Sequence, residues 1–310
     1  MVRQEIRMEF IKSGSSINFV GKMKLAFAVS AVMIVISIAS VLLHGGLNFG
    51  IDFAGGTLVQ IKFDKEPSID GIRTAFKTIG LEGSIIQSFG ANEVVIRATE
   101  SSNDLKGLSE RMGEALATTF EKGSYEIRRV EVVGPKVGKD LTQKALFAIV
   151  FSWIGMLIYI SWRFEFRYAV GGIVALVHDV IITVGAFSLL NKEFDLTIVA
   201  ALLTIIGYSI NDTIVVFDRI RENARKNMKQ SLGDTINMSI NQTLSRTILT
   251  AFTVFIVVVV LFFFGGAVIH DFAFALLIGV VIGTYSSIFI ASPIILAWEN
   301  IRPSSMKRKK

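Results

Sequence analysis

Long apolar runs separated by short polar segments fill most of this 310-residue chain. A helix that crosses a bilayer needs about 17–25 mostly apolar residues, and six runs satisfy that length. Their predicted bounds are 25–44, 143–162, 168–190, 196–217, 246–264 and 268–297, the last being long enough to tilt or to extend beyond the lipid. The pattern predicts an α-helical polytopic membrane protein with six transmembrane helices.

The segment 45–142, between the first two predicted spans, has the pattern of a soluble α+β domain. Its elements follow the order strand, helix, strand, strand, helix, strand, which is typical of the ferredoxin-like split βαβ arrangement. They are predicted as a strand at 57–63, a helix capped by Ser68 or Asp70 and ending at Gly80, a hairpin of 84–88 and 93–98 around Gly90-Ala91-Asn92, a helix from Ser102 or Asn103 to Phe120, and a strand at 126–133.

Basic residues predict the orientation of the chain. They gather in the segment 1–24, in the links after the second and fourth spans, and in the tail 298–310, whereas Lys192 is alone in the short links on the other side. By the positive-inside rule, both termini are cytoplasmic and the domain 45–142 lies on the outer face. Leucine and isoleucine recur every fourth residue near 218–245, which predicts an amphipathic helix at the cytoplasmic interface (Leu232, Ile236, Ile240 and Leu244).

Charge and composition argue against several other classes of protein. The formal net charge is +6, but the segment 45–142 has 12 Lys/Arg against 14 Asp/Glu, a net of −2, so the basic excess reflects membrane topology and not affinity for nucleic acid. The chain has no cysteine, so neither disulfides nor a cysteine-based metal site is expected. Its three histidines are scattered, and no Walker motif is present, so we expect no metal, no bound cofactor and no ATP-driven enzyme.

Asp212 is an acidic residue inside the predicted fourth span. It lies about five residues, or roughly 7–8 Å, from the charged end of that span. A carboxylate at such depth costs about 2.5–3.5 kcal/mol on insertion scales and usually serves ion or proton movement. The alternative is a side chain close enough to the helix end to be wetted.

Two polar stripes on the fourth and fifth spans lead to a hypothesis for Asp212. Residues three or four apart share one face of a helix, and the two helices run antiparallel, so Asp212 and Arg246 are expected to be able to meet. Burial disfavours a charged carboxylate and a nearby guanidinium favours it, so making and breaking this pair would alternate proton affinity. A snorkelling anchor is the alternative for Arg246. The stripes are Thr204, Tyr208, Asn211 and Asp212, and Gln242, Arg246, Thr250 and Thr253.

Three further patterns are open to two interpretations each. His178-Asp179 in the third span is either a structural pair or a second relay element, with Thr183 one turn away. Gly279 and Gly283 form a GxxxG pattern, which allows close contact with another helix of this chain or of a partner. Glycine-rich motifs bracket the soluble domain and can act as hinges, because glycine tolerates backbone angles closed to other residues (Asp52, Gly55, Gly56, Gly134, Pro135 and Gly138).

Four of these motifs together resemble the SecF family, a membrane subunit of bacterial protein secretion, and the resemblance covers residues 20–300. They are Ile51-Asp52-Phe53-x-Gly55-Gly56, Val133-Gly134-Pro135-x-Val137-Gly138, Val177-His178-Asp179-Val180 and Gly207-Tyr208-Ser209-Ile210-Asn211-Asp212-Thr213. The resemblance implies a half of a resistance–nodulation–division assembly in which ion flow moves the outer domains, with a transport role for Asp212, Arg246, Asn211 and, more weakly, Thr250.

The same resemblance implies location and partners. We expect a multi-pass protein of the bacterial inner membrane with a periplasmic domain, and a proton or sodium as coupling ion. The partners implied are SecD, the SecYEG translocon, YajC, the translocating preprotein and membrane lipid. Two other functions stay open at this point, namely export of small molecules or lipids and a passive scaffold role in the translocon.

Overall fold

The computed structural model describes residues 16–81, 83–88, 92–98, 105–121, 123–227 and 229–301. The chain divides into two compact units, and each is described by itself. The helical unit lies within Met1–Leu47, Ala148–Lys192 and Ile198–Lys310, and the α+β unit comprises Asn48–Phe147 and Glu193–Thr197. Several predictions fall outside the described residues, namely those for the segment 1–15, the turn residues Gly90-Ala91, the helix start at Ser102 or Asn103, and the tail 302–310.

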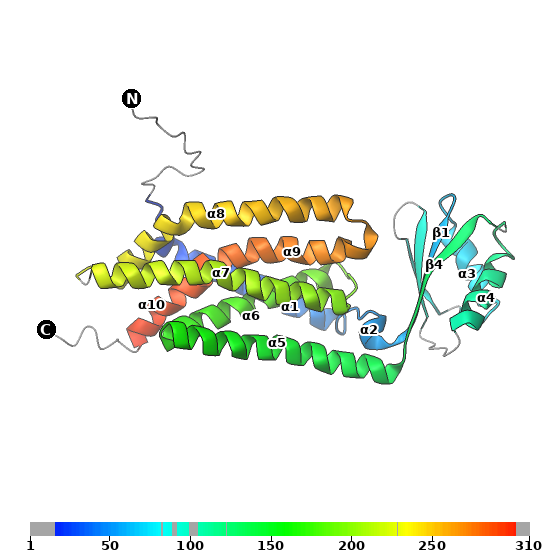
Figure 1. Ribbon diagram of the computed structural model, residues 1–310, viewed down its shortest axis with the longest axis horizontal. Coiled ribbons are helices and arrows are strands. Elements are labelled where there is room, and N and C mark those ends of the chain that lie inside the picture. The colour runs from blue at the N-terminus through cyan, green and yellow to red at the C-terminus, as the bar shows by residue number, and fades with distance from the viewer. Residues whose placement is uncertain are drawn as a thin grey trace, which may run out of the picture. The chain divides into compact units, whose positions relative to one another are not determined.

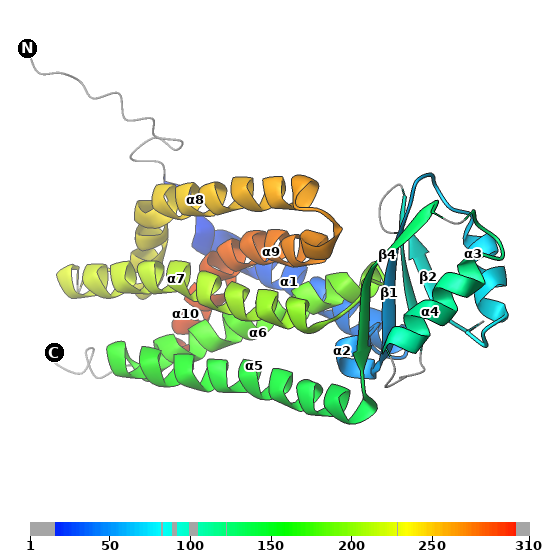
Figure 2. The same cartoon turned by 45° about the vertical axis from the view of Figure 1, so that its right-hand side comes forward.

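Six helices among the described residues are long and apolar enough to cross a membrane, which confirms the predicted fold class. In the helical unit the long helices run side by side in both views (Figures 1 and 2). Pairs of helices far apart in sequence pack together, notably α1 with α6 and α6 with α9. The first five spans are α1 (Phe19–Leu43), α5 (Pro135–Arg163), α6 (Phe166–Leu189), α7 (Leu196–Lys226) and α8 (Leu232–Phe264). The sixth span consists of α9 (Ala267–Ser286) and α10 (Ser292–Ile301) together.

Most helices extend beyond the predicted spans. Hydropathy marks the part of a helix that suits lipid, whereas the helix itself ends where its backbone is capped or broken. The helix α1 begins at Phe19 because the Asn18 side chain accepts the amide of Gly21 at 2.7 Å. Beyond its apolar part, α7 continues to Lys226, and Glu222 pairs there with Arg219 and Lys226 at 2.6 Å.

The segment predicted as an amphipathic helix is helical, and its place at the membrane interface stays a prediction. Its apolar residues belong to the long helix α8, whose N-terminal part runs in a different direction from the rest in Figure 2. Ile236 and Ile240 are fully buried and Leu244 is nearly so. A period of four residues shows that one face is apolar, but not whether lipid or protein covers that face. In this structure the protein covers it.

The last predicted span, 268–297, is one helical run with a change of winding. A π-helical turn, η1 (Ser287–Ala291), separates α9 from α10. The Ser287 hydroxyl donates to the Gly283 carbonyl at 2.9 Å, and the Ser292 hydroxyl donates to the Ser287 carbonyl at 3.0 Å. Such turns are rare in helices and occur often at functional sites.

Two asparagine side chains of α8 hold the start of α1. Asn237 Oδ1 accepts the amides of Phe19 and Val20 at 2.8 and 3.2 Å. The Asn241 side chain accepts the amide of Ile17 and donates to its carbonyl, each at 2.8 Å. These contacts satisfy backbone groups that a helix start leaves without intrahelical partners.

The α+β unit contains the predicted ferredoxin-like sheet. Its strand order is β2-β3-β1-β4, every pair is antiparallel, and a bulge shifts the β1–β4 register between Gln60 and Ile61. Helices α3 and α4 cover one face of the sheet (Figure 1), and their buried faces form a core with alternate strand residues. The elements are α2 (Ile51–Ala54), β1 (Gly56–Phe63), α3 (Ile69–Lys77), β2 (Ile85–Ser88), β3 (Glu93–Ala98), α4 (Leu105–Leu116) and β4 (Tyr125–Val133).

Candidate functional site

Asp212 lies within the continuous helix α7, and its side chain is 4% exposed. Its Oδ1 atom is 3.5 Å from the Thr250 hydroxyl on α8, at the limit of a hydrogen bond. Its Oδ2 atom is buried and has no hydrogen-bond partner among the described residues. A buried polar group without a partner costs free energy. Asp212 is therefore held in a place where protein contacts satisfy its carboxyl group only in part.

The structure brings Thr250 to Asp212 as the stripes predict, but it does not join Asp212 to Arg246. Arg246 lies on the same side of α8, one turn before Thr250, yet its side chain forms no ion pair with Asp212 in the described part of the chain. Arg246 and Asn211 are both exposed. The proposed pair is thus open in this arrangement of the helices.

Exposed polar side chains form a strip that passes Asp212 and reaches the charged end of α7. The strip follows α7 and α8, and we call it the polar strip. A bilayer core cannot hydrogen-bond such groups, so they need cover from protein or from a water-filled cavity. Its exposed residues are Thr204, Asn211, Gln242, Arg246 and Thr253.

His178 and Asp179 form a second, fully buried group on α6. Asp179 Oδ1 lies 3.0 Å from His178 Nδ1, and Oδ2 accepts the hydroxyls of Ser209 on α7 and Ser286 on α9 at 2.6 and 2.9 Å. Asp179 has no exposed surface. The Thr183 hydroxyl donates to the backbone carbonyl of Asp179 at 2.8 Å and does not touch its carboxylate.

The network continues from His178 to α1. His178 Nε2 is 3.1 Å from the Ser30 hydroxyl, which is 3.1 Å from the Tyr285 hydroxyl. Tyr285 in turn donates to the Ala26 carbonyl at 2.7 Å. Three helices besides α6 therefore contribute to one chain of hydrogen bonds.

No sequence pattern assigned a role to the serines and the tyrosine of this network. Ser30, Ser209, Tyr285 and Ser286 are hydroxyl residues in apolar helices, where a hydroxyl often bonds to its own helix. Helical spacing is the signal that could have found two of them. Ser209 lies on the same side of its helix as Asp212, and Ser286 lies on the same side of its helix as the GxxxG glycines.

Gly279 and Gly283 make a contact within this chain. A Cβ added to Gly279 would meet the Ile205 side chain, and one added to Gly283 would lie 3.0 Å from Ser209 Cβ. The GxxxG pattern therefore allows α9 to approach α7, at the level where Ser209 and Ser286 share Asp179. The alternative of a partner helix does not apply to these two glycines.

The glycine motifs meet one another in the α+β unit. Gly55 and Gly56 have φ angles of +76° and +120°, which favour glycine, between α2 and β1. Gly134 precedes α5, and Pro135 is the first residue of α5, a position where proline loses no hydrogen bond. A Cβ added to Gly138 would lie 2.7 Å from the Phe53 carbonyl, so this residue allows a close approach of backbones.

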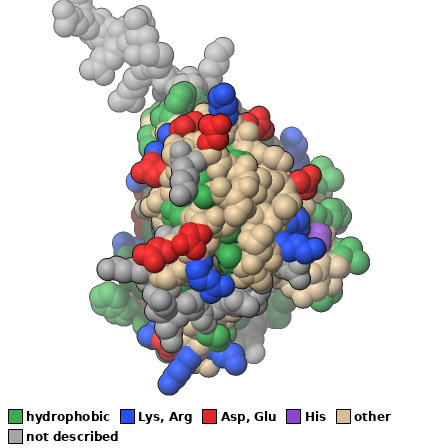
Figure 3. All heavy atoms as spheres, turned by 90° about the vertical axis from the view of Figure 1, so that its right-hand side faces the viewer, with side chains coloured by type: hydrophobic (Ala, Val, Ile, Leu, Met, Phe, Trp, Pro, Cys, Tyr) green, Lys and Arg blue, Asp and Glu red, His purple; other side chains and the backbone are tan. Residues whose placement is uncertain are grey.

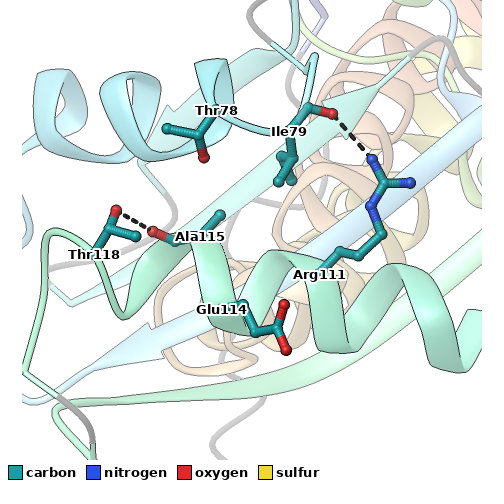
Figure 4. Close-up of a pocket in the computed structure, with 6 residues that line it drawn as sticks. All are labelled: Thr78, Ile79, Arg111, Glu114, Ala115 and Thr118. Atoms are coloured by element: carbon teal, nitrogen blue, oxygen red, sulfur yellow. Dashed lines mark hydrogen bonds between the residues drawn. The ribbon is translucent and has the colours of Figure 1, made fainter.

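A shallow groove of about 590 Å³ lies between α3 and α4 (Figure 4). Arg111 crosses it and donates to the Ile79 carbonyl at 3.2 Å, and the groove is also lined by Glu114 on α4 and by Thr118 just after that helix. Acidic and basic side chains are scattered over the face shown in Figure 3 and are not gathered by sign. In the described residues no cluster of histidine and acidic side chains could hold a metal ion.

Comparisons with known proteins agree with this architecture. The model of the protein export membrane protein SecD/SecF C-terminal family matches residues 112–301, and the SecD/SecF GG motif matches residues 40–67. The protein translocase subunit SecF of Magnetococcus marinus is 47% identical over 293 residues, covering 93% of this chain and 94% of that protein. SecF of Calditerrivibrio nitroreducens is 48% identical over 299 residues, covering 95% and 98%.

A solved structure is similar as well. The crystal structure of SecDF from Thermus thermophilus, described as a translocon-associated membrane protein, superposes with a TM-score of 0.84 at 34% identity. The match covers 93% of this chain and 39% of that longer chain.

Fold and site define a class of multi-pass membrane protein in which a ferredoxin-like domain follows the first span and a buried carboxylate lies on the fourth. Within that class, the chain belongs to the SecF family of protein translocase subunits, as its near full-length relatives show.

Proposed function

We propose that this chain acts with SecD as an accessory subunit of the Sec translocase and promotes export of preproteins with energy from ion flow past Asp212. The observation that carries the proposal is the buried, half-satisfied carboxylate of Asp212 beside the exposed polar strip. A buried carboxylic acid that lacks a fixed partner can gain and lose a proton, or bind a sodium ion, as its surroundings change.

The polar strip supports a membrane partner. Exposed side chains such as Asn211 and Arg246 cannot face lipid tails at low cost, so a second membrane protein with polar groups at the same level is expected to cover them. The solved neighbour bears the name SecDF, and this chain matches about two-fifths of it. SecD is thus the partner that the comparisons favour.

The remaining partners and the orientation are part of the proposal. The distribution of basic residues supports cytoplasmic ends of the chain and a periplasmic α+β unit, across the inner membrane. There the α+β unit is available to the preprotein, and the helical unit to SecYEG, YajC and membrane lipid. The role is one of transport, with a proton or sodium as the coupling ion and no catalytic residue.

The energy available is sufficient for a switch between two states. One charge that crosses 100 mV is worth about 2.3 kcal/mol, which shifts a two-state balance by roughly fifty-fold. Opening and closing of the Asp212–Arg246 pair would couple that shift to movement of α7 against α8.

The test is export in cells whose only copy carries Asp212→Asn, measured as the rate at which a labelled preprotein reaches the periplasm. We expect export to fall to the rate of cells that lack the chain, with unchanged membrane level and SecD association. Asp218→Asn is the matched control, because Asp218 lies on the same helix but is 55% exposed, and it should export normally. Unchanged export by an assembled Asp212→Asn protein would instead assign a passive scaffold role.

A second measurement identifies the ion. Current through the reconstituted SecD complex should follow the proton or the sodium gradient, and Asp212→Asn should abolish it. Equal currents in the original protein and in the Asp212→Asn variant would contradict the coupling role.

A further inference from the structure

The short segment between α6 and α7 connects the helix of Asp212 with the first glycine motif. Residues Glu193–Thr197 belong to the α+β unit, although α7 starts at Leu196 and continues in the helical unit from Ile198. The contacts of this segment therefore decide how the start of α7 is held.

Backbone hydrogen bonds fix Phe194 against the residues that precede α2. Its carbonyl accepts the amide of Gly50 at 2.9 Å, and its amide donates to the carbonyl of Asn48 at 2.8 Å. Phe49 and Phe194 thus form a parallel bridge. Backbone pairing of this kind sets register as well as proximity.

Three aromatic rings pack at the same place. The ring centroids of Phe49, Phe53 and Phe194 are 5.8 to 6.2 Å apart, within the range of favourable aromatic pairs. Phe53 and Phe194 are 8% and 7% exposed. The segment is consequently anchored by burial as well as by its backbone.

An ion pair between a buried arginine and a partly exposed glutamate ties the segment to the sheet. Arg97 on β3 is 8% exposed, pairs with Glu193 and donates to Gln87 on β2 at 2.8 Å. Gly50 leaves room for Glu193, because a Cβ added there would lie 2.6 Å from Glu193 Oε1. A larger residue at position 50 would displace this carboxylate.

Asp52 completes the contact at the helix itself. Its Oδ2 atom accepts the amide of Leu196, the first residue of α7, at 3.0 Å. The first amides of a helix have no intrahelical partner, and a carboxylate there also interacts favourably with the helix dipole. Asp52 thereby acts as a cap that another segment of the chain supplies to α7.

We propose that residues 48–53 and 193–197, which we call the α7 joint, form a rigid connection that fixes the start of the Asp212 helix to the sheet of the α+β unit. Asp52 is its positioning residue, and the joint stays closed while the protein works. Asp212 follows Leu196 by 16 residues of uninterrupted helix, or roughly 24 Å at about 1.5 Å per residue. A joint that holds the first turn of this helix is expected to matter for export, and that expectation rests on the proposed function.

The first experiment compares Asp52→Asn with Asp52→Ala in the full-length chain with SecD. Asparagine can still accept a hydrogen bond from the Leu196 amide, whereas alanine cannot. Loss of a cap raises the equilibrium constant for opening of a helix end by about fivefold. We expect about fivefold faster hydrogen exchange at Leu196 and Thr197 in Asp52→Ala, together with slower export, and values close to the original protein in Asp52→Asn. If both variants lose export equally, the charge of Asp52 and not its cap is required, and the proposal is overturned.

Hydrogen exchange separates this proposal from the proposed function. The cap protects the Leu196 amide whether or not ions flow, so unchanged exchange in Asp52→Ala overturns the joint alone. Unchanged export in Asp212→Asn overturns ion coupling alone.

A second experiment asks whether the joint must open. The chain has no cysteine, so Phe49→Cys with Phe194→Cys introduces the only possible disulfide, with each single variant as control for the lost ring. A closed joint predicts the same export rate for the oxidised and the reduced double variant. Export that stops on oxidation and returns on reduction would show that the joint opens in each cycle, contrary to the proposal.

Discussion

Asp179 and Asp212 are two carboxylates of the same helical unit, both nearly inaccessible, at 0% and 4% exposed. Asp179 has three side-chain partners from α6, α7 and α9, all within 3.0 Å. Asp212 has one contact at 3.5 Å and one oxygen without a partner in the described residues. Burial is similar in the two cases, but hydrogen bonding is not.

The difference suits the two carboxylates to different roles. A fully bonded group crosslinks its helices, and any change in its charge would disturb every partner. A partly bonded group can change its proton or its partner at lower cost to the fold. We therefore interpret the His178–Asp179 pair as an element of helix packing, while ion coupling stays the proposed role of Asp212.

The largest expected effect is on Asp179→Ala. This change leaves His178, Ser209 and Ser286 without their shared acceptor, so the free energy of unfolding should fall by about 2–4 kcal/mol. Equilibrium unfolding in mixed detergent measures it. A loss below about 0.5 kcal/mol would remove the distinction between the two carboxylates.

An intermediate effect is expected for Gly283→Ala. The added Cβ would lie 3.0 Å from Ser209 Cβ and would push that serine away from Asp179, at a cost of about 1–3 kcal/mol. Gly207→Ala is the control, because Gly207 is on α7, is exposed and has open space at its Cβ. There alanine should be neutral or stabilise by up to about 1 kcal/mol, and equal losses for the two variants would argue against the packing explanation.

The smallest effect on stability is expected for Asp212→Asn. The amide can still accept from Thr250, and no other described partner is lost, so unfolding should change by less than about 0.5 kcal/mol. The same unfolding assay measures it. A large destabilisation would mean that the loss of export in this variant reports on folding and not on coupling.

The sequence was sufficient for the class of fold and for the facing positions of Asp212 and Thr250. Hydrophobic runs predicted the six spans, and alternation with turn residues predicted the ferredoxin-like sheet. Helical periodicity placed Asp212 and Thr250 on facing stripes, and the structure brings them together.

Other features depend on which helices meet and at what distance. The periodicity of a sequence gives no information on either point. Arg246 shares the predicted stripe but does not reach Asp212. The serines around Asp179 come from α7 and α9, so their common partner appears only when the helices are packed. The π-helical turn depends on the local bonds of Ser287 and Ser292, which no hydropathy pattern marks.

The hydrogen bonds between Asn237 and the start of α1 have a consequence for biosynthesis. The amide of Phe19 and its acceptor are 218 residues apart in the chain. At a synthesis rate of roughly 5–20 residues per second, the ribosome makes Asn237 about 10–40 s after Phe19. During that interval, water or another protein must hydrogen-bond the backbone amides at the start of α1. The start of α1 therefore gains its last hydrogen-bond partners only after this part of α8 has been made.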